Sequence, residues 1–298
     1  MNMNRILHSL ERRSSSALKL HIQYYRRFNK IPNLFFPKTF LEKLYSRLLN
    51  PLPIFSKLAD KVEVRNYVSK VLGPDYLIPL YGVYDMLTEE DIEKLPSSFV
   101  LKANHGAGFY KVITDKSKIS IPDLVNEANN WLLIDYSKRY QEKHYGLIQP
   151  KLTAEKALLC EGKSPTDYKV HVFNCSGSDT DYLFVQVMAK KEEKMQNAFF
   201  LEDWTPAPFR LRRKNVDEIT SPDILAKPKL YDELISCAKM LAQPFCYARV
   251  DFYIHEDRLY FGEITFSHAA GNMMIEPEIW NEELGKRFSW PDRYFEPS

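Results

Sequence analysis

Two acidic residues stand inside apolar, strand-like runs near the C-terminal end of the chain. Asp251 lies in residues 248–252 (Ala-Arg-Val-Asp-Phe), and Glu263 lies in residues 260–265 (Tyr-Phe-Gly-Glu-Ile-Thr), with a short polar turn between the runs. A buried carboxylate is costly unless it is paired with a cation or bound to a metal. Two acids on adjacent strands of one hairpin can converge on Mg²⁺, which proteins often hold with one or two carboxylates plus substrate phosphates. The alternative is a surface hairpin whose acids face water.

A second candidate site is a loop of small residues that follows the apolar run 99–102, which ends in Lys102. Residues 103–109 read Ala-Asn-His-Gly-Ala-Gly-Phe, and two of the ten glycines of the chain fall within it. Glycine lets backbone N–H groups approach a phosphate closely, and a lysine at the end of the strand adds a point charge. No Gly-Lys-Ser/Thr follows, which excludes a Walker loop. The alternative is an ordinary hairpin turn.

A third candidate is the apolar run 152–159, which holds Glu155 and Lys156 side by side. The backbone of such a strand can bind the edge of an adenine ring. Glu155 would accept a hydrogen bond from the amino group, and Lys156 would reach a ring nitrogen. The alternative is an exposed edge strand that carries one ion pair.

The composition is that of a globular protein that is large enough for two or three subdomains. The chain has 298 residues, of which 45% are hydrophobic and 27% are charged. No apolar run approaches the roughly 20 residues that cross a bilayer, and the N-terminus lacks the apolar segment of a secretory signal. The four cysteines form no Cys-x-x-Cys pair. We therefore expect reduced cysteines, two of them in the core, and a cytosolic protein.

The charge of the chain is unevenly distributed. Residues 1–60 carry eleven basic and three acidic side chains, a net charge of +8, which leaves −6 for the remainder because the whole chain is +2. A basic segment with aromatic residues suits an anionic membrane or a polyanionic partner. The alternative, which we favour, is a helical face packed on the main domain.

The pattern of apolar residues predicts alternating helices and strands. Helical spacing extends over residues 5–28, 61–71 and 121–140 and lies within 222–241, and Thr88 precedes an acidic helix start. Strands are expected within 76–86, at 99–102, through most of 147–204 and in a hairpin at 246–266. This mixture indicates an α+β or α/β fold.

In this order the motifs resemble the ATP-grasp superfamily, and they match the D-alanine–D-alanine ligase pattern in detail. The resemblance spans about residues 60–275. Residues 60–65 look like its Asp-Lys helix, residues 105–109 like its mobile phosphate loop, and residues 155–158 like its adenine hinge. The implied cofactor-binding residues are Arg65, Lys102, His105, Gly106, Ala107, Gly108, Glu155, Lys156, Ala157, Leu158, Asp167 and Lys169.

The resemblance also implies a catalytic and a metal set. Arg249 would face the reacting acyl phosphate, with Lys102 and His268 as further catalytic residues. His268 would act as a base; the alternatives are a substrate contact or a structural bond. The implied metal ligands are Asp251, Glu263 and Thr265.

The likeness is greater to the TupA-like ATP-grasp branch, named for a teichuronopeptide biosynthesis protein. Similar runs are residues 60–65, 76–84, 101–106, 167–169, 249–253 and 262–266. The resemblance implies two α+β subdomains that clasp a nucleotide between antiparallel sheets. The expected parts are a basic helical extension (1–58), a helix and strand (59–96), a small subdomain (97–152) and a C-terminal subdomain (153–298).

The implied activity is that of an ADP-forming carboxylate–amine ligase in bacterial cell-surface polysaccharide synthesis. It would use ATP and Mg²⁺ to join an amino acid to a sugar acid through an acyl phosphate. The alternatives are a kinase that phosphorylates a sugar hydroxyl and a non-catalytic nucleotide- or glycan-binding module. We expect a small-molecule or polysaccharide-precursor substrate, no nucleic acid and, as in related ligases, a homodimer. A cytoplasmic location is expected, with peripheral contact to the inner membrane face through residues 1–50 as an alternative.

Two departures from the ligase pattern stand out. The metal hairpin usually ends in Glu-x-Asn, whereas Thr265 takes the place of the asparagine here. Either no second Mg²⁺ is bound, or its ligand comes instead from water or from Asn272. The usual ribose-binding carboxylate is absent from its usual place, so Asp167 and Glu161 are the candidates. An ion pair with Lys169 is the alternative role of Asp167.

Overall fold

The computed structural model describes residues 15–160, 162–174, 182–191, 194–212, 217–218 and 225–295. Its α-helices are α2 (Ser16–Phe28), α3 (Phe40–Leu49), α4 (Ile54–Ala59), α5 (Val64–Val71), α6 (Glu89–Lys94), α7 (Ile121–Leu132), α8 (Tyr136–Tyr140), α9 (Tyr231–Ala242) and α10 (Ile279–Arg287). Its strands are β1 (Leu80–Tyr84), β2 (Phe99–Ala103), β3 (Tyr110–Ile113), β4 (Leu152–Lys156), β5 (Asp167–Phe173), β6 (Tyr182–Lys191), β7 (Lys194–Leu201), β8 (Arg210–Arg212), β9 (Asp217–Glu218), β10 (Tyr247–His255), β11 (Arg258–Thr265) and β12 (Met274–Glu276).

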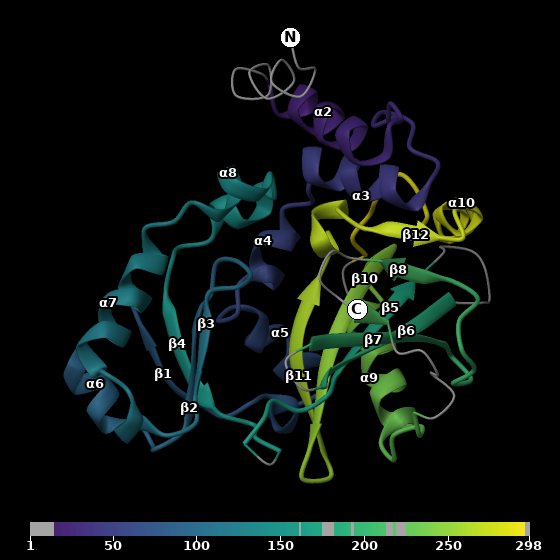
Figure 1. The fold of residues 1–298 in the computed structure, drawn as a ribbon. Helices are drawn as coiled ribbons and strands as arrows, with labels where there is room; N and C mark the ends of the chain where they lie inside the picture. The colour runs from purple at the N-terminus through teal and green to yellow at the C-terminus, as the bar shows by residue number, and fades with distance from the viewer. Residues whose placement is uncertain are drawn as a thin grey trace.

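Within the described residues the strands form two main sheets (Figure 1). The smaller sheet has the order β1-β4-β2-β3, and the larger one has the order β11-β10-β5-β6-β7-β9; β8 and β12 form a separate pair. Helix α7 covers the smaller sheet and α9 covers the larger one. In the view of Figure 1, α4 and α5 lie between the two sheets.

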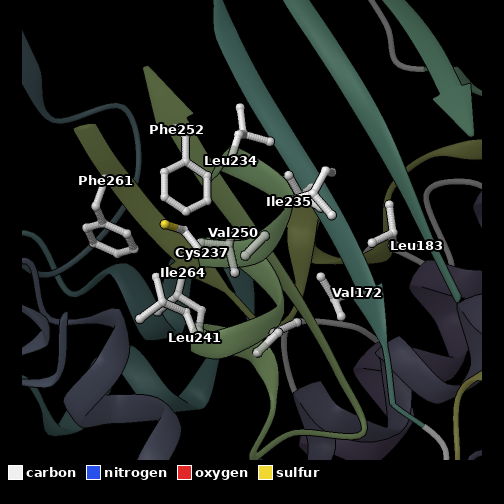
Figure 2. Close-up of a cluster of buried hydrophobic side chains, with 14 of the residues drawn as sticks. Val172, Leu183, Leu234, Ile235, Cys237, Leu241, Val250, Phe252, Phe261 and Ile264 are labelled. Atoms are coloured by element: carbon white, nitrogen blue, oxygen red, sulfur yellow. The ribbon is translucent and has the colours of Figure 1, made fainter. Parts of the chain in front are cut away.

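The larger sheet has one apolar face and one polar face because its side chains alternate. On β10, Ala248, Val250 and Phe252 point to the apolar face, where α9 contributes Leu234 and Leu241. Figure 2 shows this cluster, with Val172 of β5 and Leu183 of β6 beside it. The intervening residues of β10, namely Tyr247, Arg249 and Asp251, therefore lie on the opposite face.

A β-bulge at Gly262 breaks the alternation of β11. Asp251 pairs with Glu263, but Phe252 pairs with Phe261, so Gly262 is the extra residue. Phe261 and Glu263 are two residues apart and would share a face in a regular strand. The bulge lets Phe261 pack in the apolar cluster while Glu263 faces the other side. A Cβ on residue 262 would lie 3.1 Å from the carbonyl oxygen of Asp251, which favours glycine here.

The N-terminal helices pack onto the polar face of the larger sheet at one end. Leu20 and Tyr24 of α2, together with Leu44 and Tyr45 of α3, join a core that includes Tyr247 of β10. Helix α3 begins with a capping box in which Thr39 accepts from the backbone of Glu42 and Glu42 accepts from the backbone of Thr39. The predicted packing of a helical face on the main domain is therefore confirmed for α3. Residues 5–14 of the expected first helix lie outside the described residues.

Arg47 of α3 is the main polar anchor of this packing. Its side chain is 1% exposed and binds both carboxylate oxygens of Asp292, at 2.5 and 2.8 Å. A third hydrogen bond runs to the carbonyl oxygen of Phe266, and the guanidinium lies 4.5 Å from the ring centre of Phe288. Lys43 is also buried, with its ammonium on the carbonyl oxygens of Gly285 and Phe288. Two of the basic residues of the N-terminal segment thus hold the fold together.

The α+β prediction is confirmed, and several predicted boundaries are corrected. The expected helix 121–140 is two helices, because the chain leaves α7 after Leu132 and α8 begins at Tyr136. The expected helix 61–71 begins at Val64, and the expected helix within 222–241 begins at Tyr231. The smaller sheet includes β1 and β4, which lie outside the expected range 97–152. No helix among the described residues is long and apolar enough to cross a membrane.

We predict that Arg47→Ala lowers the free energy of unfolding by about 3–5 kcal/mol, because it leaves the carboxylate of Asp292 buried without its partner. Chemical denaturation followed by circular dichroism measures this loss. The exposed Arg27→Ala is the control and is expected to cost less than about 1 kcal/mol. Equal losses in the two variants would show that Arg47 is no anchor.

Candidate functional site

A cavity opens between the two sheets and carries the charged residues of several motifs. Its interior is narrow, with about 20 Å³ of space for the centre of a water molecule. Lys61 and Arg65 enter it from the segment before β1, Lys102 and Glu155 from the smaller sheet, and Glu263 from β11. The structure therefore brings together four separate motifs that are spread over about two hundred residues of the chain.

The polar face of the larger sheet carries a row of charges that crosses three strands. Glu263 of β11, Asp251 of β10 and Lys169 of β5 stand at directly paired positions. Lys169 Nζ lies 2.5 Å from Asp251 Oδ2 and 2.5 Å from Asp167 Oδ2. Asp251 is 1% exposed, so the alternative of a surface hairpin with both acids in water is wrong.

Arg249 neutralises the two hairpin acids from the next row of the sheet. Its Nε and Nη2 donate to Asp251 at 2.7 Å each, and Nη2 also donates to Glu263 Oε1 at 2.6 Å. Burial raises the pKa of Asp251, against the opposing effect of Arg249 and Lys169. Burial also acts to raise the pKa of Glu263, but Arg249, Lys169 and Lys61 together lower that pKa to about 2. Glu263 therefore stays ionised at neutral pH.

The donor set of the hairpin fits a hard cation such as Mg²⁺. Two carboxylates stand opposite each other, and the side chain of Glu263 is 40% exposed toward the cavity. The described residues contain no group of three or more acidic, histidine or cysteine side chains that could hold a metal without further ligands. A metal here would therefore share its coordination with substrate oxygens or water. Asp251 could join only after Arg249 or Lys169 moves away from its oxygens.

Thr265 supports Glu263 in this structure. Its hydroxyl donates to Glu263 Oε1 at 3.1 Å and accepts from Arg249 Nη2 at 3.1 Å. Asn272, the alternative metal ligand, instead has its Oδ1 within 3.3 Å of Gln23 Nε2 on helix α2. The role of Thr265 as a metal ligand stays a prediction.

Three cationic side chains, those of Lys61, Arg65 and Lys102, line the same cavity as Glu263 and form its cationic wall. Lys102 Nζ lies 2.6 Å from Glu155 Oε2, and Arg65 Nη1 lies 3.5 Å from Glu155 Oε1. Lys102 and Glu155 share the cavity face because Phe99 and Leu101 of β2 point into the core of the smaller sheet. Burial lowers the pKa of Lys61, and Glu263 opposes this shift. Three cations on one side of the cavity form a site suited to a polyphosphate chain.

The glycine loop is tied to the same wall. Lys61 Nζ donates to the carbonyl oxygen of Gly106 at 2.6 Å. Gly106 lies against Tyr136, and a Cβ here would come within 2.6 Å of its ring. Ala107 and Gly108 are exposed, and Gly108 has a φ of +83°, a conformation that glycine adopts without strain. His105 is 3% exposed, so its side chain lies under the loop rather than above it.

Asn104 joins the loop to the segment that carries Lys61. Its Nδ2 donates to Asp60 Oδ1 and to the carbonyl oxygen of Gln149, both at 3.0 Å. Its Oδ1 accepts from the backbone of Lys151 at 2.7 Å. One buried amide thus connects three segments: the glycine loop, the segment that carries Lys61, and the chain before β4. This contact gives Asp60 a structural role as the acceptor of the Asn104 amide.

The expected adenine hinge lies where the two sheets meet. Leu158 packs with Ile78 and Tyr260 in a small apolar cluster, and Ala157 is also buried. Lys156 stands at the rim, 3.9 Å from Glu256. The Glu155 side chain is paired with Lys102 and Arg65. Its role toward adenine stays a prediction.

Asp167 stands at the start of β5, next to the charged row. The alternative interpretation of its role is supported, because it pairs with Lys169. Its Oδ1 is nevertheless buried without a hydrogen-bond partner among the described residues. A ligand hydroxyl would satisfy this atom. Glu161, the other ribose candidate, lies outside the described residues.

His268 belongs to a buried hydrogen-bonded chain. The hydroxyl of Tyr247 lies 2.9 Å from His171 Nδ1 and 3.0 Å from His268 Nδ1. A hydroxyl has one proton, so it donates to one ring and accepts from the other. His171 pairs with Arg249 across the strands, and burial lowers the pKa of its ring far below the usual value. His268 is 3% exposed, and its use as a base stays a prediction.

The sequence profile of one family matches residues 42–289, under the description TupA-like ATPgrasp. The chain belongs to the TupA-like ATP-grasp family. The expected ATP-grasp fold is thereby confirmed. No curated protein matches the chain.

Solved structures of other proteins are similar to this chain at low identity. They include a D-alanine–D-alanine ligase from Bacillus anthracis complexed with ATP (13% identity over 71% of this chain and 55% of that one, TM-score 0.40). N5-carboxyaminoimidazole ribonucleotide synthetase from Thermus thermophilus has 10% identity (72% and 47%, TM-score 0.42). The D-alanine–D-alanine ligase from Helicobacter pylori has 12% identity (78% and 61%, TM-score 0.40). This chain thus spans roughly half to three-fifths of these proteins, and such likeness carries no information about the reaction.

Two residues at the site of this TupA-like protein were not expected from the sequence. Lys61 was expected only as part of the Asp-Lys helix, although it lines the cavity. Glu142 precedes a short 3-10 helix (Lys143–Leu147), is 6% exposed, and accepts from Ser267 Oγ at 2.7 Å. Its contact with Ser267 bridges 125 positions. The only sequence signal for Glu142 is an acid in a segment that is otherwise basic and aromatic.

Burial raises the pKa of Glu142 to about 7, and Glu263 adds to this effect. The folded protein therefore binds one more proton than the unfolded chain between about pH 4.5 and pH 7. This contribution to stability is complete below the unfolded pKa and is lost as the pH rises through about 7. We predict that Glu142→Gln, whose amide oxygen still accepts from Ser267, reduces the loss of stability between about pH 5 and pH 8 by up to about 3 kcal/mol.

Thermal denaturation of the wild type and Glu142→Gln at about pH 5 and pH 8 tests this prediction. The exposed Glu93→Gln is the control and is expected to keep the pH dependence of the wild type. Parallel curves for Glu142→Gln and the wild type would mean that Glu142 titrates normally.

Proposed function

We propose that this protein is an ADP-forming ligase that activates a carboxylate with ATP and joins it to an amine. The observation that carries the proposal is the cavity between the sheets, which is lined by Lys61, Arg65 and Lys102 together with the carboxylate of Glu263. Phosphoryl transfer depends on positioning and on charge neutralisation, and this arrangement supplies both. Membership in the ATP-grasp superfamily supports the use of ATP and Mg²⁺.

In this proposal the cationic wall holds the phosphate chain of ATP, and the exposed backbone of Ala107 and Gly108 covers it. The apolar cluster of Ile78, Leu158 and Tyr260 adjoins the base, and Asp167 Oδ1 accepts from the ribose. Asp251 and Glu263 would hold Mg²⁺, which supplies positive charge to the phosphate oxygens. A site that holds the nucleotide and the metal in fixed positions reduces the entropic cost of bringing the reacting groups together.

The reaction would proceed in two steps. A substrate carboxylate attacks the γ-phosphorus of ATP, which releases ADP and forms an acyl phosphate. An amine then attacks the acyl carbon, and inorganic phosphate leaves as the amide forms. Arg249 stands beside the hairpin acids and would stabilise the negative charge of the acyl phosphate and of the tetrahedral state.

The substrate class is also part of the proposal. We propose a precursor of a cell-surface polysaccharide as the acceptor and an amino acid as the second substrate, on the resemblance to the teichuronopeptide branch. Residues 267–272 come directly after β11, the strand that carries Glu263. In this proposal they would contact the acceptor. The kinase and the non-catalytic binding protein are separate outcomes of the experiments below.

We predict that an ATP analogue with Mg²⁺ stabilises the protein by about 2.7 kcal/mol at about one hundred times its dissociation constant. Glu263→Gln is expected to abolish the part of this shift that needs Mg²⁺, because it removes one of the two cavity carboxylates. The exposed Asp232→Asn is the control and is expected to shift like the wild type. A wild type without any thermal shift would contradict the nucleotide site.

Product analysis distinguishes the ligase from the kinase. With ATP, an amino acid and candidate sugar acids, the ligase releases one phosphate for each ADP. Hydroxylamine in place of the amine is expected to trap the acyl phosphate as a hydroxamate. ADP without free phosphate would indicate a kinase, and nucleotide binding without turnover on any substrate would indicate a binding protein.

We also predict opposite effects of two substitutions at Thr265. Thr265→Val removes the hydroxyl that supports Glu263 and is expected to weaken the apparent affinity for Mg²⁺ about tenfold. Thr265→Asn adds an amide oxygen beside the carboxylates and is expected to strengthen it. Mg²⁺ titration of the nucleotide-dependent thermal shift measures both effects, and equal midpoints would rule out any role of Thr265 at the metal.

A further inference from the structure

An ordered loop between α2 and α3 exposes three large apolar side chains. Ile31, Phe35 and Phe36 are 81%, 76% and 77% exposed, within six residues of one another. The loop lies at the end of the molecule opposite the tip of the β10–β11 hairpin (Figure 1). Exposed apolar side chains gathered in one place mark an interaction surface more often than isolated ones do.

Hydrogen bonds to the body of the protein hold this loop in position. Asn33 Oδ1 accepts from the backbone of Phe36 at 2.9 Å, and Glu42 accepts from the backbones of Asn33 and Lys38 at 3.0 Å each. Leu34 is 4% exposed, and its carbonyl oxygen accepts from Ser46 Oγ at 2.8 Å. The fold therefore presents Phe35 and Phe36 outward while it buries the residue before them.

The residues around the exposed side chains are basic. Arg26, Arg27 and Lys30 precede the loop and Lys38 ends it, and all four are exposed. Lys30 pairs with Glu278, whereas Glu42 is committed to the backbone of the loop. The surface thus combines an apolar tip with a positively charged surround.

We propose that Ile31, Phe35 and Phe36, with the basic residues around them, form a docking surface for the anionic face of a lipid bilayer. Aromatic side chains enter the boundary between headgroups and acyl chains, and lysine and arginine attract anionic headgroups. A second copy of this chain would bring the same positive charge to the surface. Charge complementarity therefore favours an anionic membrane as the partner.

The same helices reach the acceptor side of the cavity. Gln23 of α2 lies 3.3 Å from Asn272, and Tyr45 of α3 fits against Gly271, where a Cβ would come within 2.6 Å of its ring. A docked protein would hold residues 267–272 close to the membrane. This consequence, that a lipid-linked acceptor is presented to the site, rests on the proposed function, whereas the docking itself does not.

Co-sedimentation of the full chain with vesicles tests the proposal without ATP or any acceptor. Vesicles of phosphatidylcholine and phosphatidylglycerol in equal parts are compared with vesicles of phosphatidylcholine alone. The native chain is expected to bind the anionic vesicles and to be released by salt. Phe35→Ser/Phe36→Ser is expected to weaken binding about tenfold, as is Arg26→Glu/Arg27→Glu/Lys38→Glu.

Met86→Ser/Leu133→Ser is the matched control, because both side chains are large, apolar and exposed but belong to the part of the chain around the smaller sheet. It is expected to bind like the native chain, and all variants are expected to keep its melting temperature and its nucleotide-dependent thermal shift. A Phe36→Trp variant adds a direct readout, since its fluorescence is expected to shift to shorter wavelength on anionic vesicles.

Three results would overturn the proposal. One is a native chain that fails to bind anionic vesicles at low salt. Another is equal binding by the Phe35→Ser/Phe36→Ser variant and the control. The third is a native dimer that Phe35→Ser/Phe36→Ser converts to a monomer without any vesicle binding, which would assign the surface to self-association. Failure of the nucleotide shift with intact vesicle binding would instead count against the proposed function alone.

Discussion

The structure of the site depends on the neutralisation of one buried carboxylate. Asp251 lies in the middle of a central strand and is almost fully buried. An unpaired charge there would be expensive, and Arg249 and Lys169 remove this cost with three short contacts. The contact with Lys169 requires that β5 pair with β10 in one register. The register between β10 and β11 places Glu263 opposite Asp251 on the other neighbouring strand. The charges that would serve catalysis therefore also determine how three strands align.

The second constraint is that the two halves of the site come from different sheets. The cations that are proposed to bind a phosphate chain stand on the smaller sheet and on the segment before β1, whereas the carboxylates of the hairpin stand on β11 and β10. Neither sheet alone makes a nucleotide site. Asn104 and Lys61 tie the glycine loop to the connecting segment, and the Glu142–Ser267 bond ties the loop before β4 to the chain that follows β11. These polar contacts join segments that are far apart in the sequence.

The N-terminal helices α2 and α3 are packed into the core of the protein. Arg47 fixes α3 to the chain after β11 through Asp292 and Phe266, and α2 contacts Asn272. The family match begins at residue 42, inside α3, although α2 contributes to the same core. The loop between these helices is therefore connected through α2 and α3 to the residues that follow β11. The loop that carries the exposed Phe35 and Phe36 is thus joined, through α2 and α3, to the chain that follows Glu263 of the charged row.

The sequence by itself determined the local elements and the candidate residues. Alternation of apolar residues indicated β10 and β11, Thr88 and its acids indicated α6, and the order of motifs indicated the ATP-grasp family, because these signals are local in the chain. Only the tertiary structure decided which charges meet. The bulge at Gly262, the pairing of Lys169 with Asp251, and the approach of Glu142 to Ser267 depend on contacts between separate segments. The pattern of apolar residues in the sequence gives no signal for such contacts, because each depends on how separate segments of the chain pack together.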